Sequence, residues 1–320
     1  MNKKRRLLIE QNEISEILTL SLGGYDQKVL IEGKQADLPI VITLHGGPGM
    51  PIPFSVGCRG LFPDFTNQFI MVYWDQLGCG INNTVSGVNF SISDFVQMTV
   101  DLIQEMKKRF PQNKIILFGM SWGSVLCLRV VDRLKNQIDA AIVWAQIVKH
   151  PICNETVYEI LEHARISHND RLLLQDYRQK PITLETVRFI AGCIRKYTDG
   201  YNNKSGEKAS IGPIIRGLIT SPDYRLKDVK AIVVNGCMNN RSLWSEIIQS
   251  DMTDILKSVT VPYYILQGDT DIVSDTELVS EIVKNAGNKN LHCRVIEKSG
   301  HIPSKCGMDA VLEDLEKCLR

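Results

Sequence analysis

The sequence of 320 residues predicts an α/β protein with a mostly parallel central sheet and helices on both of its faces. Two observations support this fold class. Short runs of apolar and β-branched residues recur without polar alternation, as expected of strands that are buried on both faces. Segments with helical periodicity alternate with these runs, and that order requires crossover connections between parallel strands.

The N-terminal part of the chain predicts a hairpin, two buried strands and a helix. Residues 16–34 alternate apolar and polar side chains around a Gly-Gly pair, which is typical of an antiparallel hairpin. PIVITLHGGPG (39–49) and FIMVYWDQLGCG (69–80) are apolar runs that end in glycines, which predicts buried strands. Residues 91–110 have apolar side chains at helical spacing, with Asp94 near the positive end of the helix dipole.

The alternation continues with a strand over 114–119, a helix over 124–134 and a strand over 138–146. It resumes after residue 258 with two further strand–helix pairs. The expected elements there are 261–268, 275–287, 291–300 and 309–320.

Between these two parts, residues 146–258 are mainly helical in pattern, which predicts a helical cap (lid). Within this segment AIVVNG, Ala231–Gly236, predicts a short strand, and the polar stretch 199–210 predicts a loop. The core is therefore expected to consist of residues 1–145 and 259–320.

Charge and cysteine content exclude several classes of protein and partner. The formal net charge is +1, so the chain lacks the basic excess that a nucleic-acid partner requires. Nine scattered cysteines without a C-x-x-C pair predict free thiols in a reducing compartment, and hence a cytoplasmic protein. The basic run Lys3–Arg6 precedes an apolar run too short for a signal peptide or membrane span. We expect a solvated, frayed N-terminus, no membrane partner and no metal or organic cofactor.

The motif GMSWGS places Ser121 between Gly119 and Gly123. It stands between an expected strand and an expected helix, which is the context of a nucleophile elbow. Such a turn presents the serine hydroxyl at the carboxyl edge of the sheet, where open α/β sheets bind ligands. We therefore predict that Ser121 is a nucleophile.

A serine nucleophile needs a base and an acid that orients the base. His301 follows the last expected strand, and the chain order for this arrangement is serine, acid, histidine. Asp271 is favoured as the acid because it stands three residues beyond Gly268, just after a buried strand. Asp269 and Asp275 are the alternates.

Hydrolysis also needs backbone N–H groups that stabilise an oxyanion. The residue after the nucleophile, Trp122, supplies one of them, and a loop after an earlier strand supplies the other. The HGGPG loop fits this second role, because its glycines let the backbone approach a substrate. Its residues are His45, Gly46, Gly47, Pro48 and Gly49.

Five motifs together resemble α/β-hydrolases of the prolyl aminopeptidase (proline iminopeptidase) type, peptidase family S33. They are LHGGPG (44–49), YWDQLGCG (73–80), GMSWGS (119–124), QGDTD (267–271) and SGH (299–301). The resemblance runs from about Ile40 to the C-terminus. It implies an α/β-hydrolase fold with a helical cap, and a catalytic triad of Ser121, Asp271 and His301. It also implies that Gly47 and Trp122 form the oxyanion hole.

The resemblance implies the hydrolytic chemistry directly, whereas the substrate class depends on residues of the cap. Leu77 stands where the family has an arginine. Prolyl aminopeptidases bind the substrate's α-amine with acidic cap residues, for which Glu155 and Glu246 are candidates here; ordinary solvated helix charges are the alternative. The implied function is a serine hydrolase, an aminopeptidase acting on a short peptide or small molecule. A small-molecule esterase or lactonase and a non-catalytic ligand-binding homologue stay open, as does monomer against homo-oligomer.

Overall fold

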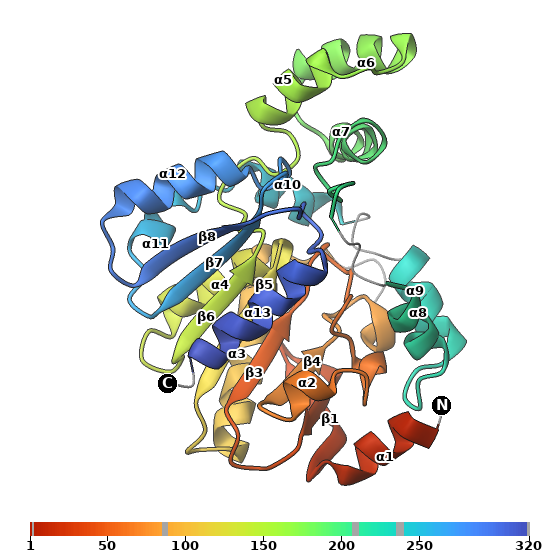
Figure 1. Ribbon diagram of the computed structural model, residues 1–320, viewed down its shortest axis with the longest axis vertical. Coiled ribbons are helices and arrows are strands. Elements are labelled where there is room, and N and C mark those ends of the chain that lie inside the picture. The colour runs from red at the N-terminus through yellow and green to blue at the C-terminus, as the bar shows by residue number, and fades with distance from the viewer. Residues whose placement is uncertain (2, 85–88, 207–210, 235–239, 319–320) are drawn as a thin grey trace.

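The computed structural model describes residues 1, 3–84, 89–206, 211–234 and 240–318. Within these residues the centre is an eight-stranded sheet with the order β1-β2-β4-β3-β5-β6-β7-β8 (Figure 1). β2 pairs antiparallel with β1 and β4, and the other neighbours are parallel. The predicted fold class is confirmed. The strands are β1 (Ile14–Leu22), β2 (Tyr25–Gly33), β3 (Ile40–Leu44), β4 (Ile70–Trp74), β5 (Ile115–Met120), β6 (Ala140–Trp144), β7 (Tyr263–Gly268) and β8 (Leu291–Ile296).

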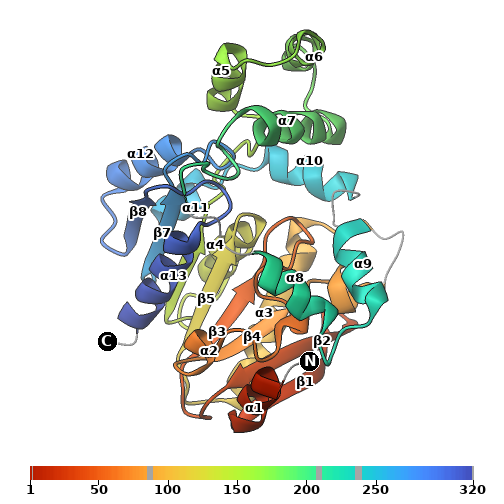
Figure 2. The same cartoon turned by 45° about the vertical axis from the view of Figure 1, so that its right-hand side comes forward.

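Helices cover both faces of this sheet, as Figures 1 and 2 show. α3, α4 and α12 contribute to one hydrophobic cluster, and α2 and α13 contribute to a second. The elements of the core outside the sheet are α1 (Lys3–Gln11), η1 (Val56–Cys58), α2 (Pro63–Thr66), η2 (Gly80–Asn82), α3 (Ile92–Arg109), α4 (Trp122–Arg133), α12 (Thr276–Ala286) and α13 (Lys305–Lys317).

Side chains of the parallel strands divide between these two clusters. In β3, Ile40 and Ile42 belong to the first cluster, whereas Val41 between them belongs to the second. Successive side chains of a strand point to opposite faces, so both faces of β3 are buried. This double burial is the reason that the strand sequences lack polar alternation.

The chain leaves the core after β6 and returns before β7. Met252 N donates to Val148 O at 2.9 Å, and Lys149 forms an isolated antiparallel bridge with Asp251. The exit and the return therefore lie side by side. The cap predicted for residues 146–258 stays a prediction, and within it we propose residues 149–251 as the insertion. The helices from β6 to β7 are α5 (Glu155–His163), α6 (His168–Arg178), α7 (Leu184–Tyr197), α8 (Ile211–Ile219), α9 (Leu226–Val234), α10 (Arg241–Gln249) and α11 (Thr253–Lys257).

The insertion helices occupy two places (Figure 2). α5, α6 and α7 stand at one end of the sheet and share a hydrophobic cluster with α10. That cluster also contains Ile272 and Val273, which follow β7. α8 and α9 lie to the side, where Leu218, Tyr224 and Ile232 join the second cluster of the core.

The strand predicted for Ala231–Gly236 is wrong for the part that the structure describes. Residues 231–234 are helical and belong to α9, while residues 235 and 236 lie outside the described residues. Asp228 accepts a hydrogen bond from Arg225 N at 2.7 Å and so holds the first turn of the helix. A short apolar run fits a strand or a buried helix equally well. In the structure the described part of the run is helical, and its Ile232 packs into the second hydrophobic cluster.

The frayed N-terminus predicted from Lys3–Arg6 is also wrong, because these residues begin α1. Arg5 is only 4% exposed. Its guanidinium donates to the carbonyl oxygens of Arg59 (2.6 Å), Gly217 (2.7 Å) and Gly57 (2.9 Å). A buried charge needs such partners. All three come from distant parts of the chain, so the local sequence does not indicate them.

Candidate active site

Ser121 lies at the joint between β5 and α4. Its φ of 50° and ψ of −117° are unfavourable for a residue with a side chain, so the turn is strained. Ser121 N donates to Trp144 O at 2.9 Å, which ties the turn to the end of β6. A strained turn between strand and helix is the local structure of a nucleophile elbow.

The glycines on both sides of Ser121 are required by close packing. A Cβ on Gly119 would lie 2.6 Å from Gly123 O and from the sulfur of Cys127. A Cβ on Gly123 would lie 1.8 Å from Leu44 O. Any side chain at either position would therefore push α4 away from β5 or β3.

The structure brings Ser121, His301 and Asp271 together. His301 Nε2 is 2.8 Å from Ser121 Oγ, and His301 Nδ1 is 2.9 Å from Asp271 Oδ2. An ionised carboxylate can only accept, so Nδ1 carries the proton and Nε2 accepts from the serine hydroxyl. Ser121 follows β5, Asp271 follows β7 and His301 follows β8. The carboxyl ends of these strands meet at one edge of the sheet.

Asp271 is the one of the three candidate aspartates that faces His301. Asp271 is 2% exposed, and its carboxylate accepts from Val273 N and from Ser274 N and Oγ. Asp269 instead accepts from backbone N–H groups of the loop after β8. Asp275 caps α12, where it accepts from Leu278 N at 3.1 Å, and its other oxygen accepts from the hydroxyl of Thr156 at 2.9 Å.

The backbone of His301 is held by residues that the motifs did not indicate. His301 N donates to Gly200 O at 2.8 Å, and the indole of Trp144 donates to His301 O at 2.9 Å. The ring of Tyr201 stands edge-on to the imidazole, with centroids 5.7 Å apart. Gly200 and Tyr201 lie in the stretch predicted as a loop, where no local pattern marks them as neighbours of a histidine.

The loop of residues 45–49, here called the oxyanion loop, touches the elbow. A Cβ on Gly46 would lie 3.3 Å from the Cβ of Ser121. Trp122 is the first residue of α4, so its backbone N–H has no acceptor within the helix. Gly47 has a φ of 119° and precedes a cis peptide bond. The oxyanion roles of Gly47 and Trp122 stay predictions.

Asp75 joins the turn after β4 to the insertion. This fully buried carboxylate accepts from Val56 N at 3.0 Å, from Ile81 N at 2.9 Å and from the hydroxyl of Tyr224. Burial raises the pKa of Asp75 to about 6, although the three hydrogen bonds act in the opposite direction. Leu77, which replaces the arginine of the resembled family, is 4% exposed and packs into the first hydrophobic cluster.

This raised pKa predicts a pH-dependent stability that Asp75→Asn should remove. The folded protein binds the Asp75 proton more tightly than the unfolded chain does. The stability gained from this protonation is therefore fully present below pH about 4. This stability is lost as the pH rises through about 6, the pKa of Asp75 in the folded protein. The loss in the free energy of unfolding is about 3 kcal/mol, because each unit of pKa difference corresponds to roughly 1.4 kcal/mol. Urea unfolding at several pH values should show the free energy of unfolding of wild type falling relative to Asp75→Asn. The exposed Asp37→Asn serves as the control; a pH-independent difference between wild type and Asp75→Asn would contradict the prediction.

The two acidic residues considered for amine binding already have partners. Glu155 begins α5 and forms an ion pair with Arg178 at 2.6 Å. Glu246 in α10 accepts from Ile92 N at 2.8 Å, at the N-terminus of α3. Among the described residues, neither carboxylate has a hydrogen bond to Ser121, Asp271 or His301.

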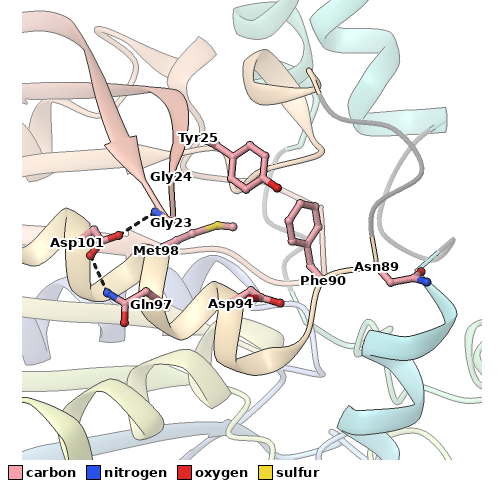
Figure 3. Close-up of a pocket in the computed structure, with 9 residues that line it drawn as sticks. All are labelled: Gly23, Gly24, Tyr25, Asn89, Phe90, Asp94, Gln97, Met98 and Asp101. Atoms are coloured by element: carbon pink, nitrogen blue, oxygen red, sulfur yellow. Dashed lines mark hydrogen bonds between the residues drawn. The ribbon is translucent and has the colours of Figure 1, made fainter.

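A hollow of about 510 Å³ lies between the β1–β2 turn and α3, apart from the serine (Figure 3). Both carboxylates that line it, Asp94 and Asp101, already have hydrogen-bond partners. Asp101 accepts from Gly23 N at 2.8 Å and from the amide of Gln97 at 2.7 Å. Asp94 completes the capping box of α3 with Ser91. The Asp101 contact attaches the hairpin to α3, and the Asp94 contact caps that helix.

Within the described part of the chain, no group of three or more His, Cys, Asp or Glu side chains is arranged to hold a metal ion. No helix in that part is both long enough and apolar enough to cross a membrane.

The chain is similar to several known hydrolases. The family model described as "Serine aminopeptidase, S33" matches residues 60–172. The "Probable aminopeptidase YbaC" of Bacillus subtilis is 21% identical over 93% of this chain and 94% of its own. A proline iminopeptidase of Thermoplasma volcanium is 24% identical over 79% of this chain and 78% of its own.

Solved structures share the fold at low sequence identity. The carboxylesterase CesB (YbfK) of Bacillus subtilis superposes with a TM-score of 0.61 at 15% identity, covering 99% of this chain and 96% of its own. A thermophilic esterase from Thermogutta terrifontis gives 0.57 at 16% identity, covering 95% and 98%. Fold, family match and relatives together support an enzyme of the α/β-hydrolase fold that is similar to serine-type hydrolases of the S33 type.

Proposed function

We propose that this chain hydrolyses an amide or ester bond through an acyl-enzyme formed on Ser121, with His301 as base and Asp271 as acid. One observation carries the proposal: Ser121 Oγ lies 2.8 Å from His301 Nε2, while Nδ1 of the same ring lies 2.9 Å from Asp271. A serine hydroxyl is a weak nucleophile alone, and this chain of hydrogen bonds is what activates it.

The reaction follows from these positions. Ser121 Oγ attacks the carbonyl carbon while its proton passes to His301 Nε2. Asp271 holds the Nδ1–H and stabilises the imidazolium that forms. His301 then protonates the leaving amine or alcohol, which departs and leaves an acyl ester on Ser121. Water, deprotonated by the same imidazole, cleaves this ester and regenerates the serine.

The negative charge on the carbonyl oxygen needs donors that are already in place. The backbone N–H groups of Gly47 and Trp122 are the proposed donors. The closeness of Gly46 to the elbow supports this, because a Cβ at Gly46 would lie 3.2 Å from Met120 O and 3.3 Å from the Cβ of Ser121. The N-terminus of α4 adds a positive partial charge at the same place.

For the substrate, we propose a short peptide or a small aminoacyl compound with a free N-terminus. The names of the relatives, an aminopeptidase and a proline iminopeptidase, support this choice. An esterase of small acyl compounds is the second candidate. It is favoured by the existing partners of Glu155 and Glu246, which leave neither carboxylate unpaired for an amine. We also propose that the insertion 149–251 covers the site as a cap.

A substrate panel separates these two candidates. Prolyl and other aminoacyl 4-nitroanilides, their N-acetylated forms and short 4-nitrophenyl esters should be compared by kcat/KM. We expect the free aminoacyl compounds to be preferred, with proline foremost. A preference for N-acetylated or simple acyl substrates would contradict the aminopeptidase assignment. Glu155→Gln and Glu246→Gln, run on the same panel, test whether either carboxylate contributes to amine recognition.

A non-catalytic binding role predicts a different result with a fluorophosphonate probe. An activated serine forms a covalent adduct with such a probe, whereas an ordinary serine does not. We expect an adduct at Ser121 in the folded protein and none after denaturation. The absence of an adduct in folded protein would support ligand binding without catalysis.

A further inference from the structure

Gln76 connects the oxyanion loop to the nucleophile elbow through hydrogen bonds on both sides. It lies in the turn after β4 and is 1% exposed. Its Oε1 accepts from the indole N–H of Trp122 at 2.9 Å, and its Nε2 donates to His45 O at 3.3 Å. Its backbone N donates to the Nε2 of His45 at 3.0 Å.

The hydrogen bonds of His45 define the protonation of its ring. Nδ1 lies 2.9 Å from Gly46 O, and a carbonyl oxygen can only accept, so Nδ1 carries the proton. Nε2 then carries no proton and can accept the hydrogen bond that the backbone N–H of Gln76 donates. Burial lowers the pKa of His45 to about 4, which keeps the ring neutral near pH 7. His45 is therefore a structural acceptor and not a second base.

We propose that Gln76 is a positioning residue that holds the two oxyanion donors at a fixed separation. This inference rests on the function proposed above. Trp122 carries one proposed donor, and its indole is held by Gln76. His45 begins the loop that carries the other proposed donor, Gly47, and its carbonyl is held by the same amide. Two donors stabilise one oxygen only when both are aimed at it within a fraction of an ångström.

The chain contains a matched control for this arrangement. Gln27 in β2 is fully buried, its Oε1 accepts from the indole of Trp74 at 2.9 Å, and its Nε2 donates to Leu22 O at 3.0 Å. Methionine at either glutamine removes the same two kinds of hydrogen bond. It also leaves the same kind of group, a buried indole N–H, without its acceptor. Gln27 lies in β2, which is three positions away in the sheet from β5, the strand that leads into the elbow.

The test compares Gln76→Met with Gln27→Met by steady-state kinetics and urea unfolding. Both substitutions should lower stability to a similar extent. Only Gln76→Met should lower kcat, by about 10²-fold, approaching the loss of one oxyanion donor, with little change in KM. The positioning role is overturned if Gln76→Met leaves kcat near wild type, or if Gln27→Met lowers kcat equally.

A second pair of variants tests the same hydrogen bond from the tryptophan side. Trp122→Phe removes the indole N–H but keeps the backbone N–H, and Trp74→Phe is its control. Trp122→Phe should lower kcat more than Trp74→Phe, and Gln76→Met should cost less in the Trp122→Phe background than in wild type. Additive losses would contradict the inference. This pair keeps the test decisive if Gln76→Met does not fold.

Ser121→Ala in the same assay separates two kinds of failure. If Ser121→Ala is inactive while Gln76→Met retains full kcat, only the positioning role is wrong. If Ser121→Ala retains activity, the proposed function and this inference are both wrong.

Discussion

Replacing Ser121 with alanine should lower kcat for the preferred substrate by about 10⁶-fold, as removal of a triad nucleophile does. The loss is large because the acyl-enzyme can no longer form, whereas substrate binding and the oxyanion donors are unchanged. KM should therefore change little, and the variant should keep the wild-type fold. The measurement is kcat and KM with the best substrate of the panel, with circular dichroism to verify folding.

The exposed Ser93→Ala, on α3, is the matched control and should retain wild-type kinetics. Any residual hydrolysis in the Ser121→Ala preparation should be examined with the fluorophosphonate probe, which then labels a contaminant and not this chain. Hydrolysis by Ser121→Ala within about tenfold of wild type would exclude the acyl-enzyme mechanism, given the 10⁶-fold loss expected of it.

Asp271→Asn should lower kcat by about 10⁴-fold, the size of effect seen when a triad acid becomes an amide. The asparagine amide would favour the wrong tautomer of His301, with the proton on Nε2, and that nitrogen could no longer accept from Ser121. Because Asp271 also accepts from Val273 and Ser274, some stability should be lost as well. Kinetics and thermal unfolding of the variant give the two effects separately.

Asp269→Asn and Asp275→Asn are the controls for this assignment, because both aspartates lie on the same loop. Asp269 accepts from the backbone of Lys298 and Ser299, and Asp275 caps α12. Each substitution should therefore lower stability with a far smaller effect on kcat than Asp271→Asn. A larger loss of kcat in Asp269→Asn than in Asp271→Asn would reassign the acid.

The sheet and the elbow could be predicted because their signals are local. The buried strands were recognisable from apolar runs such as Ile40–Leu44 and Ile115–Met120, and the fold class followed from the alternation with helices. The two glycines beside Ser121 marked a turn in which helix and strand approach closely. The sequence also suggested Asp271 over its neighbours, but only from its distance beyond a glycine.

The errors fall where distant contacts override a local pattern. The apolar run after Lys230 is equally suited to a strand, but its described residues belong to α9, where Ile232 packs against the core. The basic run at the N-terminus looked solvated, yet Arg5 finds three carbonyl acceptors in the loop before α2 and in α8. No local pattern marks Gly200 as a contact of His301, and the motif that contains Gln76, YWDQLGCG, does not specify its contact with Trp122.

By itself, the sequence determined a parallel α/β sheet and the chain order of Ser121, Asp271 and His301, because strand burial, turn glycines and element order are local or sequential properties. Only the tertiary structure decided that Asp271 faces His301, that the insertion holds the histidine's backbone, and that Gln76 joins two motifs. Each of these depends on hydrogen bonds between residues far apart in the chain. The energy of such a bond depends on where its partner lies in space, and spacing along the sequence does not specify that position.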